Sequence, residues 1–221
     1  MSSSVGSQRS SGTVEQPRGP VLASRPLLAF RTVDLVSAAM LGVAFGVVFW
    51  AWNLIYVATS GPVGALIAPL TSILAGPWLL AGVVGGLLIR RPGAALLTEV
   101  VAASVSALIG NEWGWTTVLS GTMQGLGVEV ALALFVWKRF GPTTAVLAGA
   151  LAAVFEVVFY EWHTWLADYD VQYKLIYLAF FVLSGAVVAG LGGLGIVRAL
   201  ARTGAVNTLP AGQEALERSA R

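Results

Sequence analysis

Residues 89–115 read IRRPGAALLTEVVAASVSALIGNEWGW and contain one complete apolar segment with the two turns that bound it. The segment follows the basic turn of residues 90–93, runs from about residue 94 to 109, and ends at an acidic and aromatic loop. Lys and Arg are retained in cytoplasmic loops during membrane insertion, and Trp gathers at membrane–water interfaces. The stretch therefore predicts a helix that crosses a membrane from a cytoplasmic turn to an outer loop.

Five further apolar segments follow the same pattern along the chain. We expect an all-α integral membrane protein with six transmembrane helices, at about residues 33–57, 78–89, 94–109, 116–137, 143–160 and 173–197. Residues 61–77 are also apolar, but three prolines and three glycines interrupt them. That run is too short and too broken to cross about 30 Å of hydrocarbon. We expect it to form an outer loop that folds over the helix bundle or dips into it.

The distribution of basic residues predicts the orientation of the chain. Twelve of its thirteen Lys and Arg residues fall in the two tails or in the turns after the second and fourth helices, and Lys174 is the exception. This asymmetry predicts that both termini are cytoplasmic and that the chain lies in the cell membrane. We expect a disordered cytoplasmic tail at residues 1–30, one membrane domain at residues 31–199 and a polar cytoplasmic tail at residues 200–221.

Composition excludes several classes of function. The chain is 57% hydrophobic and 11% charged, and it contains no Cys and one His, so neither a thiolate site nor a His-cluster metal site is expected. It has no P-loop and no G-x-S-x-G or H-E-x-x-H motif, so we expect no enzyme, no catalytic residue and no cofactor. The net charge of +2 comes from loops and tails, and it does not indicate nucleic-acid binding.

Three carboxylates lie inside apolar helices, where a charge costs about 2.5–3.5 kcal/mol on insertion scales and needs a partner or a function. From the helical rise, Glu99 and Glu129 lie roughly 10 Å above the inner turns, and Glu156 lies roughly 20 Å above its own. We therefore expect two deep acids and one outer acid rather than one cluster. The deep pair could bind a ligand, or it could tie helices together through hydrogen bonds.

The outer side of the bundle carries most of the aromatic residues. Glu156, Tyr160 and His163 share one helix face if the fifth helix extends that far. Tyr173 begins the sixth helix nearby, and Trp113 lies in the loop before the fourth. Interfacial anchoring explains many such aromatics. Their combination with acids also suits a flat, cationic, partly apolar organic ligand, through stacking and cation–π contacts. Ala38, Gly42 and Gly46 form a stripe of small residues on the first helix, suited to packing within the bundle or to docking another membrane subunit.

The stretch at residues 89–115, followed by GTMQGLGVEVALALFVWKRFG at residues 121–141, resembles the YkoE family. These proteins are S components, the substrate-binding membrane subunits of energy-coupling factor (ECF) transporters, for thiamine or its hydroxymethylpyrimidine precursor. The resemblance implies an outward-facing pocket covered by loops, and partners that comprise a transmembrane coupling protein and cytoplasmic ATPase subunits. It also implies that the small-residue stripe docks the coupling protein. The family's motif residues correspond here to Glu99, Asn111, Gln124 and Glu129.

The sequence thus predicts a substrate-binding S component whose pocket is bounded below by the deep acids and above by the outer set. Thiamine and hydroxymethylpyrimidine stay open as ligands because both contain the same pyrimidine ring. Two other functions stay open at this point. One is a stand-alone, cation-coupled carrier that uses Glu99 and Glu129 as a relay, and the other is a structural subunit of a larger membrane complex.

Overall fold

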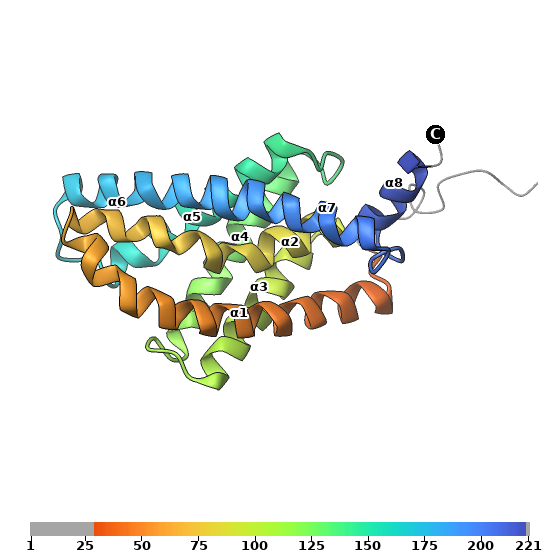
Figure 1. Cartoon of the computed structure of the whole chain (residues 1–221). Coiled ribbons are helices and arrows are strands. Elements are labelled where there is room, and N and C mark those ends of the chain that lie inside the picture. The colour runs from red at the N-terminus through yellow and green to blue at the C-terminus, as the bar shows by residue number, and fades with distance from the viewer. Residues whose placement is uncertain (1–28, 220–221) are drawn as a thin grey trace, which may run out of the picture.

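The computed structural model describes residues 29–219, and these residues form helices joined by short turns (Figure 1). The predicted all-α class is confirmed, because the described part of the chain contains helices and turns but no strand. Almost all of the tail predicted at residues 1–30 lies outside the described residues, so its disorder stays a prediction.

Five helical stretches of the described chain are long and apolar enough to span a membrane, so this is a multi-pass membrane protein. They are α1 (Thr32–Gly64), η1 with α2 (Ala68–Leu79 and Leu80–Ile89), α4 (Thr116–Leu134), α5 with η2 (Pro142–Phe159 and Glu161–His163), and α6, η3 and α7 in succession (Val171–Ser184, Gly185–Gly192 and Gly193–Thr203). The helix α3 (Ala94–Ile109) has 16 residues. At about 1.5 Å per residue it is shorter than the hydrocarbon core. The sixth span therefore stays a prediction, as does the cytoplasmic placement of the termini.

The outer loop expected at residues 61–77 is helical instead, and that expectation was wrong. Its first residues complete α1, and most of the remainder forms η1, a 3-10 helix that continues directly into α2. Prolines are accommodated there because the irregular backbone is covered by protein. Ser184 Oγ on α6 donates to the carbonyl oxygen of Ile73 at 2.5 Å and accepts from the amide of Gly76 at 3.0 Å. Neighbouring helices thus supply partners that a lipid-exposed 3-10 segment would lack.

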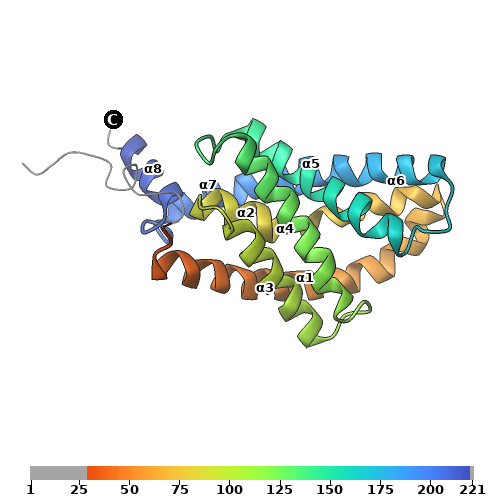
Figure 2. The same ribbon diagram turned by 180° about the vertical axis from the view of Figure 1, so that it is seen from behind.

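The helices form a bundle with two chemically different ends. In Figure 1, α1 runs along one side and α6 with α7 along the other, and η1 and α2 lie between them; Figure 2 shows α3, α4 and α5 from behind. We call the end that carries Arg31, Arg90 and Arg198 the basic end, and the opposite end, with Tyr56 and Trp113, the aromatic end. At the basic end α1 begins beside the C-terminal segment, where Arg31 Nη2 donates to the carbonyl oxygen of Thr208 at 3.0 Å.

The small-residue stripe of α1 packs against α3. Ala38 is fully buried, and a Cβ atom placed on Gly42 would lie 2.6 Å from the Cβ of Val101. One placed on Gly46 would lie 2.8 Å from the carbonyl oxygen of Ala102. Small residues are therefore needed because the two backbones approach closely. With α3 covering the stripe, the structure favours packing over docking for these three residues.

The C-terminal residues expected to form a polar tail include a further helix, α8 (Pro210–Ser219), which packs against the basic end. Leu209 and Ala211 are buried there, and Arg90 Nη2 lies 2.6 Å from Glu214 Oε2. Burial opposes ionisation of Glu214, but hydrogen bonds and charge from Arg90 and Arg218 outweigh it and lower the pKa of this carboxyl below its ordinary value. An ion pair and a small apolar contact thus hold α8 on the bundle.

Candidate functional site: an aromatic and acidic cavity

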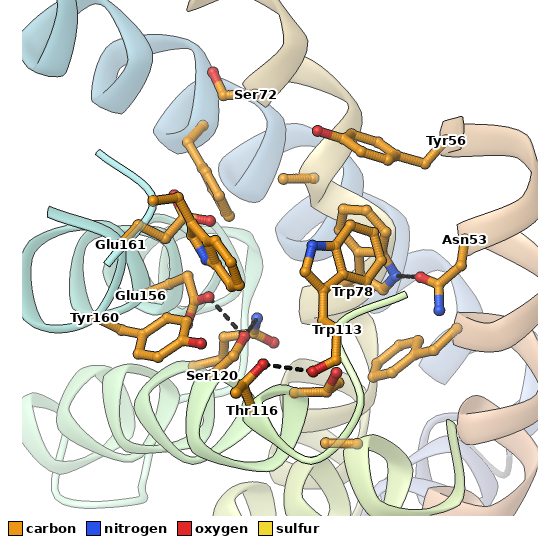
Figure 3. A pocket seen from close by; sticks show the side chains of 18 of the residues that line it. Asn53, Tyr56, Ser72, Trp78, Trp113, Thr116, Ser120, Glu156, Tyr160 and Glu161 are labelled. Atoms are coloured by element: carbon orange, nitrogen blue, oxygen red, sulfur yellow. Dashed lines mark hydrogen bonds between the residues drawn. The ribbon is translucent and has the colours of Figure 1, made fainter. Parts of the chain in front are cut away.

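A cavity of about 400 Å³ lies at the aromatic end of the bundle (Figure 3). Its walls come from α1, η1, α3, α4, α5, η2 and α6, so segments far apart in the sequence converge on it. Its volume falls in the range of pockets that bind small organic molecules.

One side of the cavity is an aromatic cluster. Tyr56, Trp78 and Trp113 contact one another with ring centroids 5.0–5.7 Å apart. Trp78 Nε1 donates to Asn53 Oδ1 at 2.8 Å, which fixes the orientation of the indole ring. The amide of Asn53 in turn donates to Ser106 Oγ at 3.4 Å. This side therefore presents ring faces and edges whose positions are set by packing and hydrogen bonds.

The loop that carries Trp113 is held in place by Asn111, which lies outside the cavity lining. Asn111 Oδ1 accepts a hydrogen bond from the backbone amide of Trp113 at 3.0 Å, and its Nδ2 donates to Ser106 Oγ at 3.2 Å. The hydroxyl of Thr116 donates to the carbonyl oxygen of Trp113 at 2.6 Å. The sequence predicted Asn111 as a ligand contact, whereas the structure places it as the residue that shapes the loop.

The facing side of the cavity is acidic. Figure 3 shows Glu156, Tyr160 and Glu161 across the cavity from Trp78 and Trp113. Ser120 Oγ donates to Glu156 Oε1 at 2.6 Å. The other carboxylate oxygens, Oε2 of Glu156 and Oε2 of Glu161, are buried and have no hydrogen-bond partner within residues 29–219.

The floor of the cavity joins Glu99 to Glu156. Glu99 is fully buried, and its Oε2 accepts from the amide of Gly82 at 2.5 Å. With its nitrogen turned toward these acceptors, the Gln124 side chain donates to Glu99 Oε1 at 3.2 Å and to the Trp78 carbonyl oxygen at 3.0 Å. In this orientation the Gln124 side-chain oxygen lies 3.1 Å from Ser120 Oγ, and Ser120 Oγ also contacts Glu156 Oε1. The expectation that the acids form no cluster was wrong for this pair, because both side chains line one cavity and are linked through Gln124 and Ser120 of α4.

Glu129 does not line the cavity, and its role differs from that of Glu99. Its Oε1 accepts hydrogen bonds from the amides of Ala95 at 2.8 Å and Leu96 at 3.3 Å, in the first turn of α3. The N-cap of α3 is Gly93, which has no side chain to accept these bonds. Glu129 thus caps α3 from the neighbouring helix α4, in the position where a helix dipole favours a negative charge.

Two other predicted contacts also lie off the cavity. His163 is exposed at the end of η2, and Tyr173 stacks on Tyr169 with ring centroids 4.3 Å apart. Of the nine residues predicted to bind substrate, five line the cavity: Glu99, Trp113, Gln124, Glu156 and Tyr160. The other four, Asn111, Glu129, His163 and Tyr173, lie outside its lining.

Several lining residues were not among the predicted contacts. Trp78 was assigned to the start of a span after a loop, and Glu161 to an outer loop, so neither was placed beside a pocket. Ser120 lies one helical turn before Gln124, and this spacing could have identified it as a member of the same face. Asn53 lies inside an apolar helix, and that position is the sequence signal of a functional or hydrogen-bonded polar residue.

The chemistry of the lining suits an organic ligand. Four glutamates, Glu99, Glu112, Glu156 and Glu161, line the cavity without any Lys, Arg or His from the described chain. The described residues contain no group of three His, Cys, Asp or Glu side chains that could hold a metal ion. Carboxylates facing aromatic rings are instead the arrangement that recognises an organic cation.

Comparisons with known proteins place this bundle in a transporter family. Residues 33–155 match a family model described as the permease component of an ABC-type cobalt transport system. YkoE of Bacillus subtilis (strain 168), named provisionally as an HMP/thiamine permease, is 30% identical over 187 residues, covering 84% of this chain and 92% of that protein. The crystal structure of an S-component of an ECF transporter superposes with a TM-score of 0.80 at 29% identity, covering 87% of this chain and 96% of that one. These relatives are transport proteins rather than enzymes, and the chain belongs to the YkoE family of ECF-transporter S components.

Proposed function

We propose that this chain captures thiamine or its hydroxymethylpyrimidine precursor in the cavity at its aromatic end, as the substrate-binding subunit of an ECF importer. The name of the Bacillus subtilis relative supports the ligand class. The lining of the cavity supports it independently, through its acidic and its aromatic side.

The observation that carries the proposal is the absence of a protein cation beside the cavity acids. Lys, Arg and His side chains are missing from the described lining, although four glutamates line it. Buried carboxylates are stable only with a partner, and a positively charged ligand supplies one. Glu156 and Glu161, each with an oxygen that has no hydrogen-bond partner in the described chain, are the residues we expect to face the ligand's positive charge.

The aromatic side supplies the second half of recognition. Thiamine contains a flat pyrimidine and a positively charged thiazolium ring, and both can stack on the cluster of Tyr56, Trp78 and Trp113. Hydroxymethylpyrimidine offers the pyrimidine alone and would use the same aromatic side with fewer charged contacts. Thiamine is therefore the ligand that uses both sides of the cavity.

Energised uptake would require a transmembrane coupling protein and cytoplasmic ATPase subunits. The sequence contains no P-loop, so the energy must come from partners of that kind. A stand-alone carrier that relays ions between Glu99 and Glu129 finds less support, because Glu129 does not line the cavity that Glu99 lines and its Oε1 caps α3.

Tryptophan fluorescence of the purified chain tests the proposal, since three indoles, those of Trp78, Trp113 and Trp165, line the cavity. We expect saturable quenching by thiamine or hydroxymethylpyrimidine, and a smaller response in Trp113→Phe. Trp115→Phe is the matched control, because Trp115 lies two residues away, is 65% exposed and does not line the cavity. Weaker stacking on the smaller phenyl ring should reduce affinity by about 2- to 13-fold in Trp113→Phe alone, from roughly 0.5–1.5 kcal/mol. No response to either compound in the unmodified chain would contradict the ligand assignment.

A further inference from the structure

A second hollow lies at the basic end of the molecule. It shares no lining residue with the cavity described above, and its charged residues are mainly basic rather than acidic. It has a volume of about 740 Å³ and is formed by α2, the turn between α4 and α5, α7 and α8. Its charged lining consists of Arg90, Lys138, Arg198, Arg202, Arg218 and Glu214. Five cations and one acid therefore surround this space.

Three of these cations are not neutralised by an acid of the described chain. Glu214 is occupied by ion pairs with Arg90, at 2.6 Å, and with Arg218. Lys138, Arg198 and Arg202 are exposed and form no ion pair within residues 29–219. The hollow thus retains a positive charge that an anion would complement.

The arrangement of the three cations favours one shared anion. Arg198 and Arg202 lie four residues apart on α7, so their side chains occupy the same face of that helix. Lys138 approaches from the turn that follows α4 and lines the same hollow. Guanidinium groups bind phosphate oxygens in a bidentate geometry, and an ammonium adds a point charge.

The remaining wall of the hollow is apolar and continuous with the membrane span. Leu194 and Val197 belong to the stretch that ends in α7, and Leu87 belongs to α2. Across from them, the ring of Phe140 lies 4.4 Å from the guanidinium carbon of Arg90. Leu87, Leu194 and Val197 are at most 5% exposed, so the protein already covers most of this wall. The place of the hollow at the ends of membrane-spanning helices is therefore what favours a lipid headgroup over a soluble anion.

We propose that this hollow binds an anionic phospholipid, with its phosphate between Lys138, Arg198 and Arg202. The cations lie at the ends of membrane-spanning helices, where the headgroup phosphates of a bilayer are found. Basic pockets between helices at that level are a known form of lipid recognition. The bound lipid would also join α7 to the α4–α5 turn. This hollow is separate from the ligand cavity, and its occupant does not depend on which ligand the cavity binds.

Thermal unfolding of the purified full chain in a neutral detergent tests this site, with phosphatidylglycerol or phosphatidylcholine added. Phosphatidylglycerol should raise the unfolding midpoint by roughly 3 °C at tenfold excess over its dissociation constant, and phosphatidylcholine should not. The triple variant Lys138→Gln, Arg198→Gln, Arg202→Gln should lose this shift. In the matched single variants, Lys138→Gln should reduce the shift and Arg139→Gln should keep it, because Arg139 neighbours Lys138 but does not line the hollow.

Additional arms separate the sources of the anion. Inorganic phosphate and glycerol phosphate should produce no shift, and an equal shift with either would replace the lipid by a soluble anion. An unchanged lipid shift in the triple variant would overturn the proposal. If the triple variant kept this shift and also failed to assemble with coupling subunits, the hollow would instead bind an acidic protein segment.

Discussion

Acidic residues at the two ends of this protein have opposite surroundings. At the basic end, Asp34 lies 2.6 Å from Arg31, and Glu214 lies 2.6 Å from Arg90, so each carboxylate has a cation of the same chain beside it. At the aromatic end, Glu156 and Glu161 face a cavity whose described lining contains no cation. The acids of the basic end therefore serve the fold, whereas those of the cavity are arranged for a charge that arrives from outside the chain.

The same contrast separates the two deep acids of the bundle. Glu99 is joined through Gln124 to the cavity, and Glu129 caps the first turn of α3. Both glutamates lie at similar distances from their basic turns along the sequence. Depth in a membrane span therefore does not determine a carboxylate's role, which depends on the groups that its helix face meets.

The largest predicted effect comes from neutralising a cavity acid. Glu156→Gln keeps the size and the acceptor for Ser120 but removes a charge that we expect the ligand to meet. Loss of one partner from a buried charge pair costs about 2 kcal/mol or more, which corresponds to at least a 30-fold weaker dissociation constant for thiamine. Isothermal titration measures this change. An unaltered affinity would show that the cavity acids, like the acids of the basic end, do not meet the charge of the ligand.

A smaller effect, of a different kind, is predicted for Glu129→Gln. The substitution weakens the cap on α3 and should lower the stability of the bundle by about 0.5–2 kcal/mol, because a neutral amide interacts less favourably with a helix N-terminus. Thermal unfolding in detergent measures this loss, and the ligand affinity of the folded fraction should stay within about twofold of the unmodified chain. A large loss of affinity with unchanged stability would return Glu129 to the binding site.

The smallest effect is predicted for Glu214→Gln, which removes the ion pair between α8 and α2. Because this carboxyl is partly exposed, the stability cost should be below about 1 kcal/mol. Its pKa is lowered in the folded chain, so its contribution is present above the ordinary value of 4.5 and is lost as the pH falls through the lowered pKa. The difference in unfolding midpoint between the two proteins should therefore be seen at pH 7 and vanish in acid. A difference that grows in acid would contradict the ion pair.

The helical class and most span positions followed from the sequence because apolar length and basic turns are local signals. The helical structure of residues 61–77 did not follow from the sequence. Prolines by themselves indicate a break in a helix, and the hydrogen-bond partners that stabilise this backbone come from α6. Ser184 contributes two of those hydrogen bonds and lies more than one hundred residues away. The site depends on this segment, because η1, which most of it forms, also carries Trp78 into the cavity.

Part of the candidate site could be predicted for a similar reason. Residue type and membrane depth indicate Glu99, Trp113, Glu156 and Tyr160, and the family resemblance adds Gln124; all five line the cavity. Residue type and depth do not indicate which helices lie next to one another in the plane of the membrane. A sequence gives the height of a residue along its helix but not the direction in which the helix leans, so Glu161 and Trp78 were not associated with the site.

Native mass spectrometry of the purified chain, offered a mixture of thiamine, hydroxymethylpyrimidine and uncharged pyrimidines, tests the central claim most directly. We predict a single added mass that corresponds to thiamine or hydroxymethylpyrimidine, retained in Glu129→Gln and lost when Glu156→Gln and Glu161→Gln are combined. The same added mass in the double variant, or no added mass in the unmodified chain, would contradict the claim that the cavity acids receive the ligand.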